Sequence, residues 1–411
     1  MAFGIALAPT AYATNGYFAH GYGLKAKGMA GAAIALPQDA IAAAYNPAGF
    51  FFVADRLDLG VDWFSPTRGA TLRGSPAPIN GNYDGSNKKD FYIPEFGYKR
   101  ALGPNLAFGL SVYGNGGMNT DYTTAFPLFG TSPAGVNLEQ AFVAPSLAWQ
   151  LAPGQVLGAA LNFAYQRFKA AGLENFTAPV GSPQQFSQFP ADVTNKGHDT
   201  STGWGLRVGW MGKLAPCSFG VTYQTKTKMS EFDAYRGLFA EQGGFDIPAN
   251  YGAGVACPVV QNVTVAFDVV RIEYSGVTSI ANPLLPNLFQ APLGSAGGAG
   301  FGWEDVTAYK LGLQWQVNPD LALRAGFNYG KQPIPARETL FNVLAPGVVE
   351  EHYTLGATVK VGAQAELTGA LMYAPEKTVR GANSIPAPFG GGEADIRLKE
   401  VSFGVALGWR F

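Results

Sequence analysis

Few residues of this 411-residue chain have the types and spacing that catalysis or metal binding requires. The three histidines, His20, His198 and His352, form no metal-spaced cluster with cysteine or acidic residues. His198 lies near Ser201, the one loop pair that a serine hydrolase could use. The glycines that begin at Gly21 have the wrong spacing for a dinucleotide loop and follow no strand. The sequence therefore predicts no catalytic residue, no cofactor, no metal site and no enzyme.

A second set of candidate functional residues consists of charged side chains that the alternation places on the inner face of the predicted strands. Because unpaired charge in a partly buried interior is costly, we expect most of them to pair with one another or to support an interior segment. Lys310 and Arg167 are the candidates for binding the carboxylate of a fatty-acid substrate. A hydrocarbon substrate would need neither cation. The set comprises Arg207, Lys310, Arg324, Lys360, Arg410, Asp58, Asp62, Glu95, Asp268 and Glu366.

Two long connectors, at 169–201 and 230–246, are more apolar than loops that face water should be. Exposed apolar clusters usually mark a binding surface, although these side chains could also pack on one another as a cap. The residues predicted to bind a hydrophobic ligand are Phe176, Phe186, Phe189, Leu238 and Phe239.

These residues require elements to position them, and strand-type alternation recurs from about residue 56 to the end of the chain. At the C-terminus, Phe403, Leu407 and Trp409 share one face with other apolar residues, and small or polar residues occupy the other. Such a strand has lipid on one side and a lumen on the other. We predict about fourteen strands, at 56–65, 91–100, 105–114, 138–151, 155–168, 202–214, 217–229, 247–257, 262–274, 305–317, 320–330, 350–361, 363–374 and 396–411.

The connectors alternate between tight turns and long loops, which is the signature of an outer-membrane β-barrel. A soluble β-sandwich would explain the alternation within strands but gives no reason for this pattern of connectors. A lumen of about fourteen strands is too wide for side chains alone to fill. We therefore predict an all-β transmembrane antiparallel barrel at 54–411 and a small helical plug at 14–53.

Composition agrees with a barrel in a membrane. Charged residues are only 14% of the chain, glycine accounts for 54 of 411 residues, and the net charge is −1, which gives no field to hold nucleic acid. No apolar run is long enough for a transmembrane helix. The apolar start ends in Ala11, Tyr12 and Ala13, a small-x-small pattern. We interpret residues 1–13 as the remnant of a signal peptide.

The plug segment, TNGYFAHGYGLKAKGMAGAAIALPQDAIAAAYNPAGF, resembles the N-terminal hatch of the FadL/TodX family of outer-membrane transporters. Asn46, Pro47 and Ala48 are its most specific part, and the resemblance continues through FNYGKQPIPA at 327–336 to the terminal Phe411. It covers essentially the whole mature chain. The chain departs from the fatty-acid members in having a shorter third long loop and no carboxylate-binding pair that can be aligned.

The resemblance implies a fourteen-stranded barrel plugged by the hatch, with an external groove formed by the third and fourth long loops. It also implies an inward kink in the third strand that opens a lateral gap. We expect a monomer in the bacterial outer membrane, in contact with lipid and lipopolysaccharide, that takes up long-chain fatty acids or aromatic or aliphatic hydrocarbons passively. The alternatives are a general porin for polar solutes and a lipid-modifying enzyme.

The expected gating residues lie in the hatch and in the third strand. Gly114, Gly116 and Gly117 permit a bulge, although they would also suit a strand that simply ends. The side chain of Asn46 can bond nearby backbone and so, with Pro47 and Ala48, fix the plug to the wall. Tyr17 and Phe18 are expected either to project into the substrate pocket as a movable stopper or to pack within the hatch.

Cys217 and Cys257 lie beside successive short-turn ends of neighbouring strands. Both would be at the periplasmic rim, where disulfides form, provided that the register brings them together. The sequence leaves this pairing open.

Overall fold

The structure is a computed structural model that describes residues 15–411, so the expected signal segment and its boundary lie outside the described residues. It contains one sheet of 16 strands, of which β2 (Gly81–Asp84) and β9 (Lys228–Met229) are short side pairings. The remaining fourteen long strands form an antiparallel ring that β1 and β16 close. The predicted strand number and barrel fold are confirmed.

The long strands match the predicted ranges within a few residues at most ends. They are β1 (Arg56–Arg73), β3 (Phe91–Ala101), β4 (Leu106–Ala125), β5 (Pro133–Ala152), β6 (Gln155–Ala171), β7 (Asp199–Leu214), β8 (Cys217–Gln224), β10 (Asn250–Val260), β11 (Val263–Ile272), β12 (Val306–Asn318), β13 (Leu321–Gly330), β14 (Glu351–Val361), β15 (Ala365–Val379) and β16 (Glu393–Arg410). The largest difference is the expected loop at 115–137, most of which is strand. A bulge at Asn115 lets β4 continue past the glycines that suggested its end.

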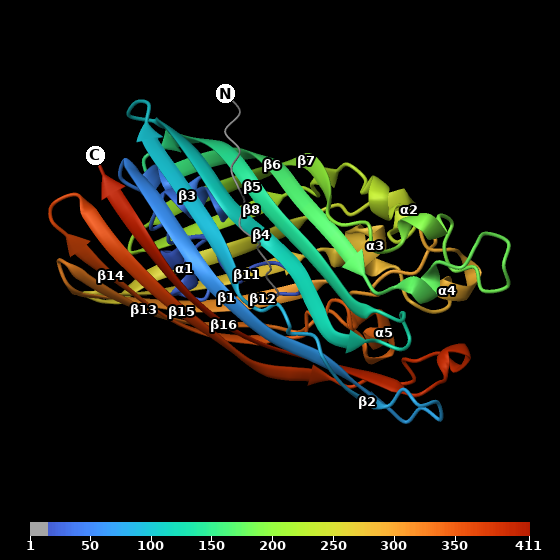
Figure 1. Ribbon diagram of the computed structural model, residues 1–411. Helices are drawn as coiled ribbons and strands as arrows, with labels where there is room; N and C mark the ends of the chain where they lie inside the picture. Colours follow the sequence, from blue (N-terminus) through green and yellow to red (C-terminus); the bar gives the residue numbers. More distant parts are fainter. Residues whose placement is uncertain (1–14) are drawn as a thin grey trace.

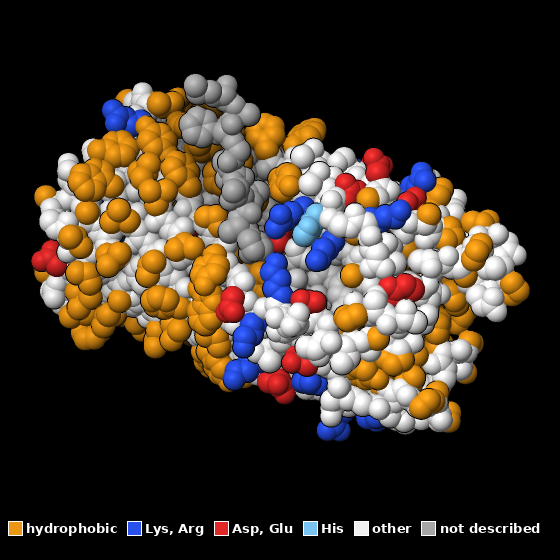
Figure 2. All heavy atoms as spheres, viewed as in Figure 1, with side chains coloured by type: hydrophobic (Ala, Val, Ile, Leu, Met, Phe, Trp, Pro, Cys, Tyr) orange, Lys and Arg blue, Asp and Glu red, His pale blue; other side chains and the backbone are white. Residues whose placement is uncertain are grey.

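The alternation along each strand separates an apolar outer face from a buried inner face. On β16, Phe403, Val405 and Leu407 are exposed, whereas the intervening Ser402 and Gly404 are buried. Figure 2 shows apolar side chains covering the wall toward one end and charged side chains gathered in a band nearer the other. This distribution fits a wall surrounded by lipid.

Short turns lie at one end of the barrel, beside the C-terminus, and the helices α2–α5 gather at the other (Figure 1). None of the helices within residues 15–411 is long and apolar enough to cross a membrane. The bounds of the helices after the first strand are α2 (Ala240–Gly243), α3 (Thr278–Ala281), α4 (Asn287–Gln290), α5 (Thr339–Asn342), η3 (Glu174–Phe176), η4 (Pro190–Asp192), η5 (Asp233–Tyr235), η6 (Tyr274–Gly276), η7 (Ala336–Glu338) and η8 (Ala387–Phe389).

The N-terminal segment, residues 15–53, lies inside the barrel and contains α1 (Leu24–Lys27), η1 (Ala40–Ala44) and η2 (Gly49–Phe52). Nearly all of its residues are buried. Glycine on the wall permits its close approach, because a Cβ at Gly158 would lie 2.2 Å from the carbonyl carbon of Pro47. The amide of Asn46 donates to the carbonyl oxygens of Ile34, 3.1 Å away, and Trp210, 2.9 Å away. Asn46 thus ties the segment to β7.

Most of the predicted lumen charges hold this segment, as expected. The ammonium of Lys27 lies 2.8 Å from the Asp62 carboxylate, and Lys25 pairs with Glu366. One carboxylate oxygen of Asp268 accepts from the backbone N–H groups of Ala33 at 2.7 Å and Ile34 at 2.9 Å. Lys360 and Arg410 differ from expectation, because their side chains are exposed rather than enclosed in the lumen.

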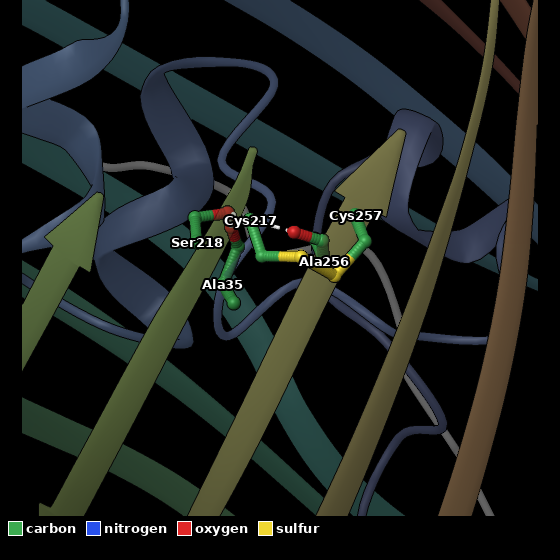
Figure 3. The surroundings of a disulfide bond; sticks show 5 residues. All are labelled: Ala35, Cys217, Ser218, Ala256 and Cys257. Carbon is green, nitrogen blue, oxygen red and sulfur yellow. Dashed lines mark hydrogen bonds between the residues drawn. A yellow bond between two sulfur atoms is a disulfide. The ribbon is translucent and has the colours of Figure 1, made fainter. Parts of the chain in front are cut away.

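Cys217 and Cys257 form a disulfide between β8 and β10 at the short-turn end (Figure 3). The register supplies the contact that the sequence left open, since Ser218, the neighbour of Cys217, pairs with Ala256, the neighbour of Cys257. The hydroxyl of Ser218 also donates to the carbonyl oxygen of Ala35 at 2.7 Å. The disulfide therefore lies beside the N-terminal segment.

Candidate functional site

The wall of the barrel has an interruption between β3 and β4. Pairing of these strands stops at Phe96 and Val112, although β3 continues to pair with β1 as far as Phe91. Further along β4, the backbone of Asp121 bonds to Gly85 and Asn87 instead. Residues 113–120 of β4 thus pair with no residue of β3, at the position where a lateral gap is expected.

The bulge in β4 lies within this interruption. Gly114 pairs with Ala141 and Gly116 with Gln140, so that Asn115 is the extra residue on its strand. Pairing with β5 continues on both sides of the bulge, and Gly117 lies directly after it. Pro145 of β5 pairs with Leu110 of β4, outside the interruption.

The N-terminal segment pairs with β4 where β3 has left it. Phe18 and Gly116 form an antiparallel bridge. The Gly117 N–H donates to the Tyr17 carbonyl oxygen at 3.1 Å, and the Ala19 N–H donates to the Asn115 carbonyl oxygen at 3.1 Å. Residues 17–19 therefore act as a short substitute strand on the inside of the opening.

Tyr17 and Phe18 are both buried and lie within an aromatic cluster. The ring centroid of Tyr17 is 5.4 Å from that of Tyr274, 6.0 Å from that of Trp303 and 6.2 Å from that of Phe245. The backbone N–H of Tyr17 also donates to the hydroxyl of Tyr274 at 3.1 Å. Burial fits the expected packing, and a stopper role would require this cluster to separate.

Above this cluster, toward the long loops, lies an apolar cavity of about 40 Å³. Three of the predicted ligand-binding residues, Phe176, Leu238 and Phe239, line it, together with Phe168 and Phe341. The volume has room for water but not for a hydrocarbon ring, since ligand pockets usually measure at least about 300 Å³. The surrounding loops must therefore move before a substrate can enter.

An open groove of about 700 Å³ lies on the outer side of these loops. Phe186 lines it with Phe289 of α4 and Phe389 of η8, and its ring centroid is 5.5 Å from that of Phe389. The groove is formed by the loops at 172–198, 273–305 and 380–392, which are the third, fifth and seventh long loops in chain order. The expectation that the third and fourth loops form it is wrong for the fourth, because Leu238 and Phe239 face the cavity instead.

The remaining predicted binding residues have other partners. Lys310 is buried and donates to the carbonyl oxygen of His20 at 2.9 Å. Arg167 lies on the outward face of β6, alternating with buried residues, and its guanidinium is 2.6 Å from the Glu139 carboxylate. The expected lumen position of Arg167 is therefore wrong. The guanidinium of Arg236 lies 4.5 Å above the ring of Phe189.

Glu174 holds the third long loop in place over the cavity. Its carboxylate accepts a hydrogen bond from Ser132 and another from Asn195, at 2.9 Å in the latter case. Burial alone would raise the pKa of Glu174, but these hydrogen bonds lower it below its usual value. These hydrogen bonds therefore favour the ionised form of Glu174.

Sequence reasoning missed the groove residues Phe289 and Phe389 and the cavity residue Phe341. Each lies in a long connector, so the apolar signal that selected Phe176 could also have selected them. The sequence also contained no sign that His352 of β14 and Glu400 of β16 lie together, with 3.9 Å between the His352 Nε2 atom and a Glu400 carboxyl oxygen. That contact depends on strand register, which no local pattern reports.

The sequence profile of a family described as outer membrane protein transport protein (OMPP1/FadL/TodX) matches residues 5–411. No curated protein matches the chain. The toluene transporter TodX of Pseudomonas putida has a similar structure, with a TM-score of 0.70 and 17% identity, covering 97% of this chain and 100% of that one. A FadL homologue of Pseudomonas aeruginosa gives a TM-score of 0.69 and 16% identity, covering 96% of this chain and 100% of that one. The Ralstonia pickettii toluene transporter TbuX gives a TM-score of 0.66 and 16% identity, covering 96% of this chain and 99% of that one.

Proposed function

The chain belongs to the OMPP1/FadL/TodX family of outer membrane transport proteins, and from this premise we propose that it is a passive, monomeric channel for hydrophobic small molecules. The substrate is captured in the outer groove, enters the apolar cavity, passes the N-terminal segment and leaves sideways between β3 and β4. The segment acts as a hatch, and the protein performs no catalysis.

Capture at the loops is supported by their aromatic lining. Phe186, Phe289 and Phe389 present apolar surface in an open groove at the end of the barrel that carries the long loops. Phe176 connects the two sites, because its ring centroid is 5.6 Å from that of Phe186 and it also lines the cavity. Burial of apolar surface at both sites favours transfer of a hydrophobic solute out of water.

The observation that carries the proposal is the pairing of residues 17–19 with β4 inside the wall opening. Hydrogen bonds from Ala19 to Asn115 and from Gly117 to Tyr17 join the segment to β4, a short contact compared with a full strand pair and so one that can open locally. While it is formed, the segment covers the inner side of β4 at the bulge. We propose that its release from Gly116 and Gly117 opens the lateral route and that Gly114 provides part of the bend.

Lateral release is favourable for an apolar substrate. A molecule that leaves through the wall enters lipid and avoids the cost of entering water, about 0.8 kcal/mol per CH₂ group. Passage through the segment toward the short-turn end would instead require the ion pairs of Lys25 and Lys27 to separate. The gap between β3 and β4 is therefore the exit that we propose.

The substrate that we propose is uncharged. Lys310 is bound to the His20 carbonyl oxygen and lies opposite Asp268, and Arg167 is bound to Glu139 on the outward face. Neither cation is free to receive a carboxylate. This favours hydrocarbons and related neutral molecules over long-chain fatty acids. The neighbouring structures of TodX and TbuX are those of toluene transporters, which agrees with this choice.

Uptake by cells tests the proposal. Cells that lack their own transporter and express this chain receive radiolabelled toluene and oleate in parallel. We expect toluene uptake above that of cells without the chain, and the same uptake in the Arg167→Gln variant. Oleate uptake that is lost in the Lys310→Met and Arg167→Gln variants would instead identify a carboxylate-reading channel.

Conductance separates this proposal from a general porin. A purified, plugged barrel in a planar bilayer should carry little steady current. A large, constant conductance together with uptake of small sugars would contradict the proposal.

A further inference from the structure

Among residues 15–411, a group of buried polar side chains in the lumen has no hydrogen-bond partner. Both side-chain polar atoms of Glu400, His352 and Asn328 lack one among residues 15–411, and all three residues are 0% exposed. The Nε2 atom of His20 in the N-terminal segment is also unpartnered within this described part. Buried polar groups in proteins are nearly always satisfied, so this group needs an explanation in water or in a ligand.

The register of the barrel brings these side chains together on the lumen face. Asn328 of β13 pairs with His352 of β14, and Lys310 of β12 pairs with Asn328. The Nε2 atom of His352 lies 3.9 Å from the Glu400 carboxylate of β16. The rings of His20 and His352 are stacked, with centroids 5.8 Å apart. The group therefore forms one site between the wall and the segment that we propose as the gate.

This polar site is close to the apolar cavity along the chain of aromatic contacts. Phe239 of the cavity is 4.9 Å from Phe245 between ring centroids, and Phe245 is 6.2 Å from Tyr17. Tyr17 is three residues before His20. The segment whose His20 stacks on His352 therefore also carries Tyr17, which belongs to the aromatic contacts that lead to the cavity.

The chemistry of the site selects the class of ligand. Asn328 and a neutral His352 each offer one donor group and one acceptor, and Glu400 offers a buried carboxyl group. Lys310 and Asp268 are committed to the N-terminal segment, and the guanidinium of Arg68 donates to backbone carbonyls of Pro66 and Lys88. A substrate carboxylate would be buried here without a free cation from residues 15–411 to pair with, which is costly, and a plain hydrocarbon would leave the polar atoms of these three residues unpartnered. A hydroxyl both donates and accepts.

We propose that Glu400, His352 and Asn328 form a polar subsite that hydrogen-bonds the hydroxyl group of a mainly apolar, neutral substrate, namely a phenol or an alcohol. The proposal rests on the proposed transport function and specifies its substrate class. Glu400 accepts from the ligand hydroxyl, and His352 or Asn328 donates to its oxygen.

Equilibrium dialysis of the purified full-length protein against labelled p-cresol and toluene tests the subsite, because the two probes differ by one hydroxyl group. The measured quantity is the ratio of the toluene dissociation constant to that of p-cresol. We expect this ratio to fall about tenfold in Glu400→Leu and in His352→Leu, as removal of a buried hydrogen bond predicts. Glu400→Gln retains hydrogen-bonding atoms and should largely keep the wild-type ratio.

Thr368→Val is the matched control, because the Thr368 hydroxyl is buried on the same inner wall but is 2.9 Å from its partner Thr358. Its ratio should equal that of the wild type. Circular dichroism and the gel shift between unheated and boiled samples establish that each variant is folded. If Glu400→Leu does not fold, His352→Leu and Glu400→Gln still decide the result.

A ratio that is unchanged in folded Glu400→Leu and His352→Leu would overturn the subsite and leave water as the partner of these groups. An equal fall in Thr368→Val would overturn it as well. Such results combined with normal toluene uptake by cells would leave the transport function standing, whereas absence of uptake would remove both.

Discussion

The contact between the N-terminal segment and β4 can be broken by a single methyl group. In Gly116→Ala, the new Cβ would lie 2.0 Å from the carbonyl oxygen of Tyr17, which is far inside van der Waals contact. The two nearest atoms, the carbonyl oxygen and carbonyl carbon of Tyr17, belong to the backbone, so they cannot rotate away as a side chain would. Residues 17–19 must therefore shift from β4, and the bridge between Phe18 and Gly116 is lost.

The magnitude follows from the hydrogen bonds that this shift removes. They join Ala19 to Asn115 and Gly117 to Tyr17, each at 3.1 Å. At about 0.5–1.5 kcal/mol each, their loss weakens docking of the segment by about 1–3 kcal/mol, which changes the docking equilibrium about 5- to 150-fold. The steric overlap adds to this value. The substitution should shift the gate toward its open state.

Two assays measure this shift. Hydrogen exchange of the peptide that contains Tyr17 and Ala19 should become faster in Gly116→Ala, and toluene uptake at limiting concentration should rise. The matched control is Gly369→Ala, because Gly369 is also a strand glycine but a Cβ there has its nearest neighbour at 4.0 Å. Exchange and uptake should remain at wild-type values in the control.

Faster exchange without any change in uptake would refute the gating role of the segment. Unchanged exchange in a folded Gly116→Ala would refute the structural reasoning itself, because it would mean that the contact adapts to the methyl group.

Three further predictions concern the loops and the rim. Replacing both Cys217 and Cys257 by alanine should lower the unfolding free energy by about 3–4 kcal/mol, given their separation of 40 residues, and should leave uptake unchanged; urea denaturation with and without reductant measures this. Phe186→Ala and Leu238→Ala should each raise the half-saturating toluene concentration about three- to tenfold, since each removes apolar contact from the groove or the cavity. The pKa of Glu174 is lower in the folded protein than the ordinary glutamate pKa of about 4.3, so the ionised carboxylate stabilises the loop above that value. This stabilisation is lost as the pH falls through the folded pKa of Glu174. Proteolysis of the loop at 172–198 should therefore accelerate only below about pH 4.3.

Each of these predictions has an outcome that contradicts it. Equal stability of the wild type with and without reductant would deny the disulfide a stabilising role. Val180→Ala is the control for the loop variants, because Val180 is exposed in the same loop, and an equal effect there would remove the specificity of Phe186. Loop proteolysis that rises already between pH 7 and pH 5 would show that another group controls the loop.

Much of the barrel could be predicted from the sequence, because its signals are local. The period of two along a strand depends on one residue and its near neighbours, so Phe403 and Leu407 reveal an apolar face without any knowledge of the partner strand. Turn residues at the ends of these runs define the two rims. The same alternation places Arg167 with Phe163 on the outward face, so the strand pattern itself contradicts the lumen position expected for Arg167.

The site depends on contacts that no local pattern contains. The pairing of Phe18 with Gly116 and of Cys217 with Cys257 requires the register between distant segments. Likewise, His352 and Glu400 each look like an isolated polar residue in their own strands, and only the stagger of the closed barrel brings them within 3.9 Å.

By itself, the sequence determined the kind of protein: the strands, their apolar outer faces, the long and short connectors and the interior segment. The tertiary structure decided where the wall is interrupted, which loops form the groove, and which polar groups lie together without partners. The physical reason is that alternation and turn chemistry act between residues close in the chain, whereas closure, register and packing of the interior segment minimise free energy over the whole barrel at once.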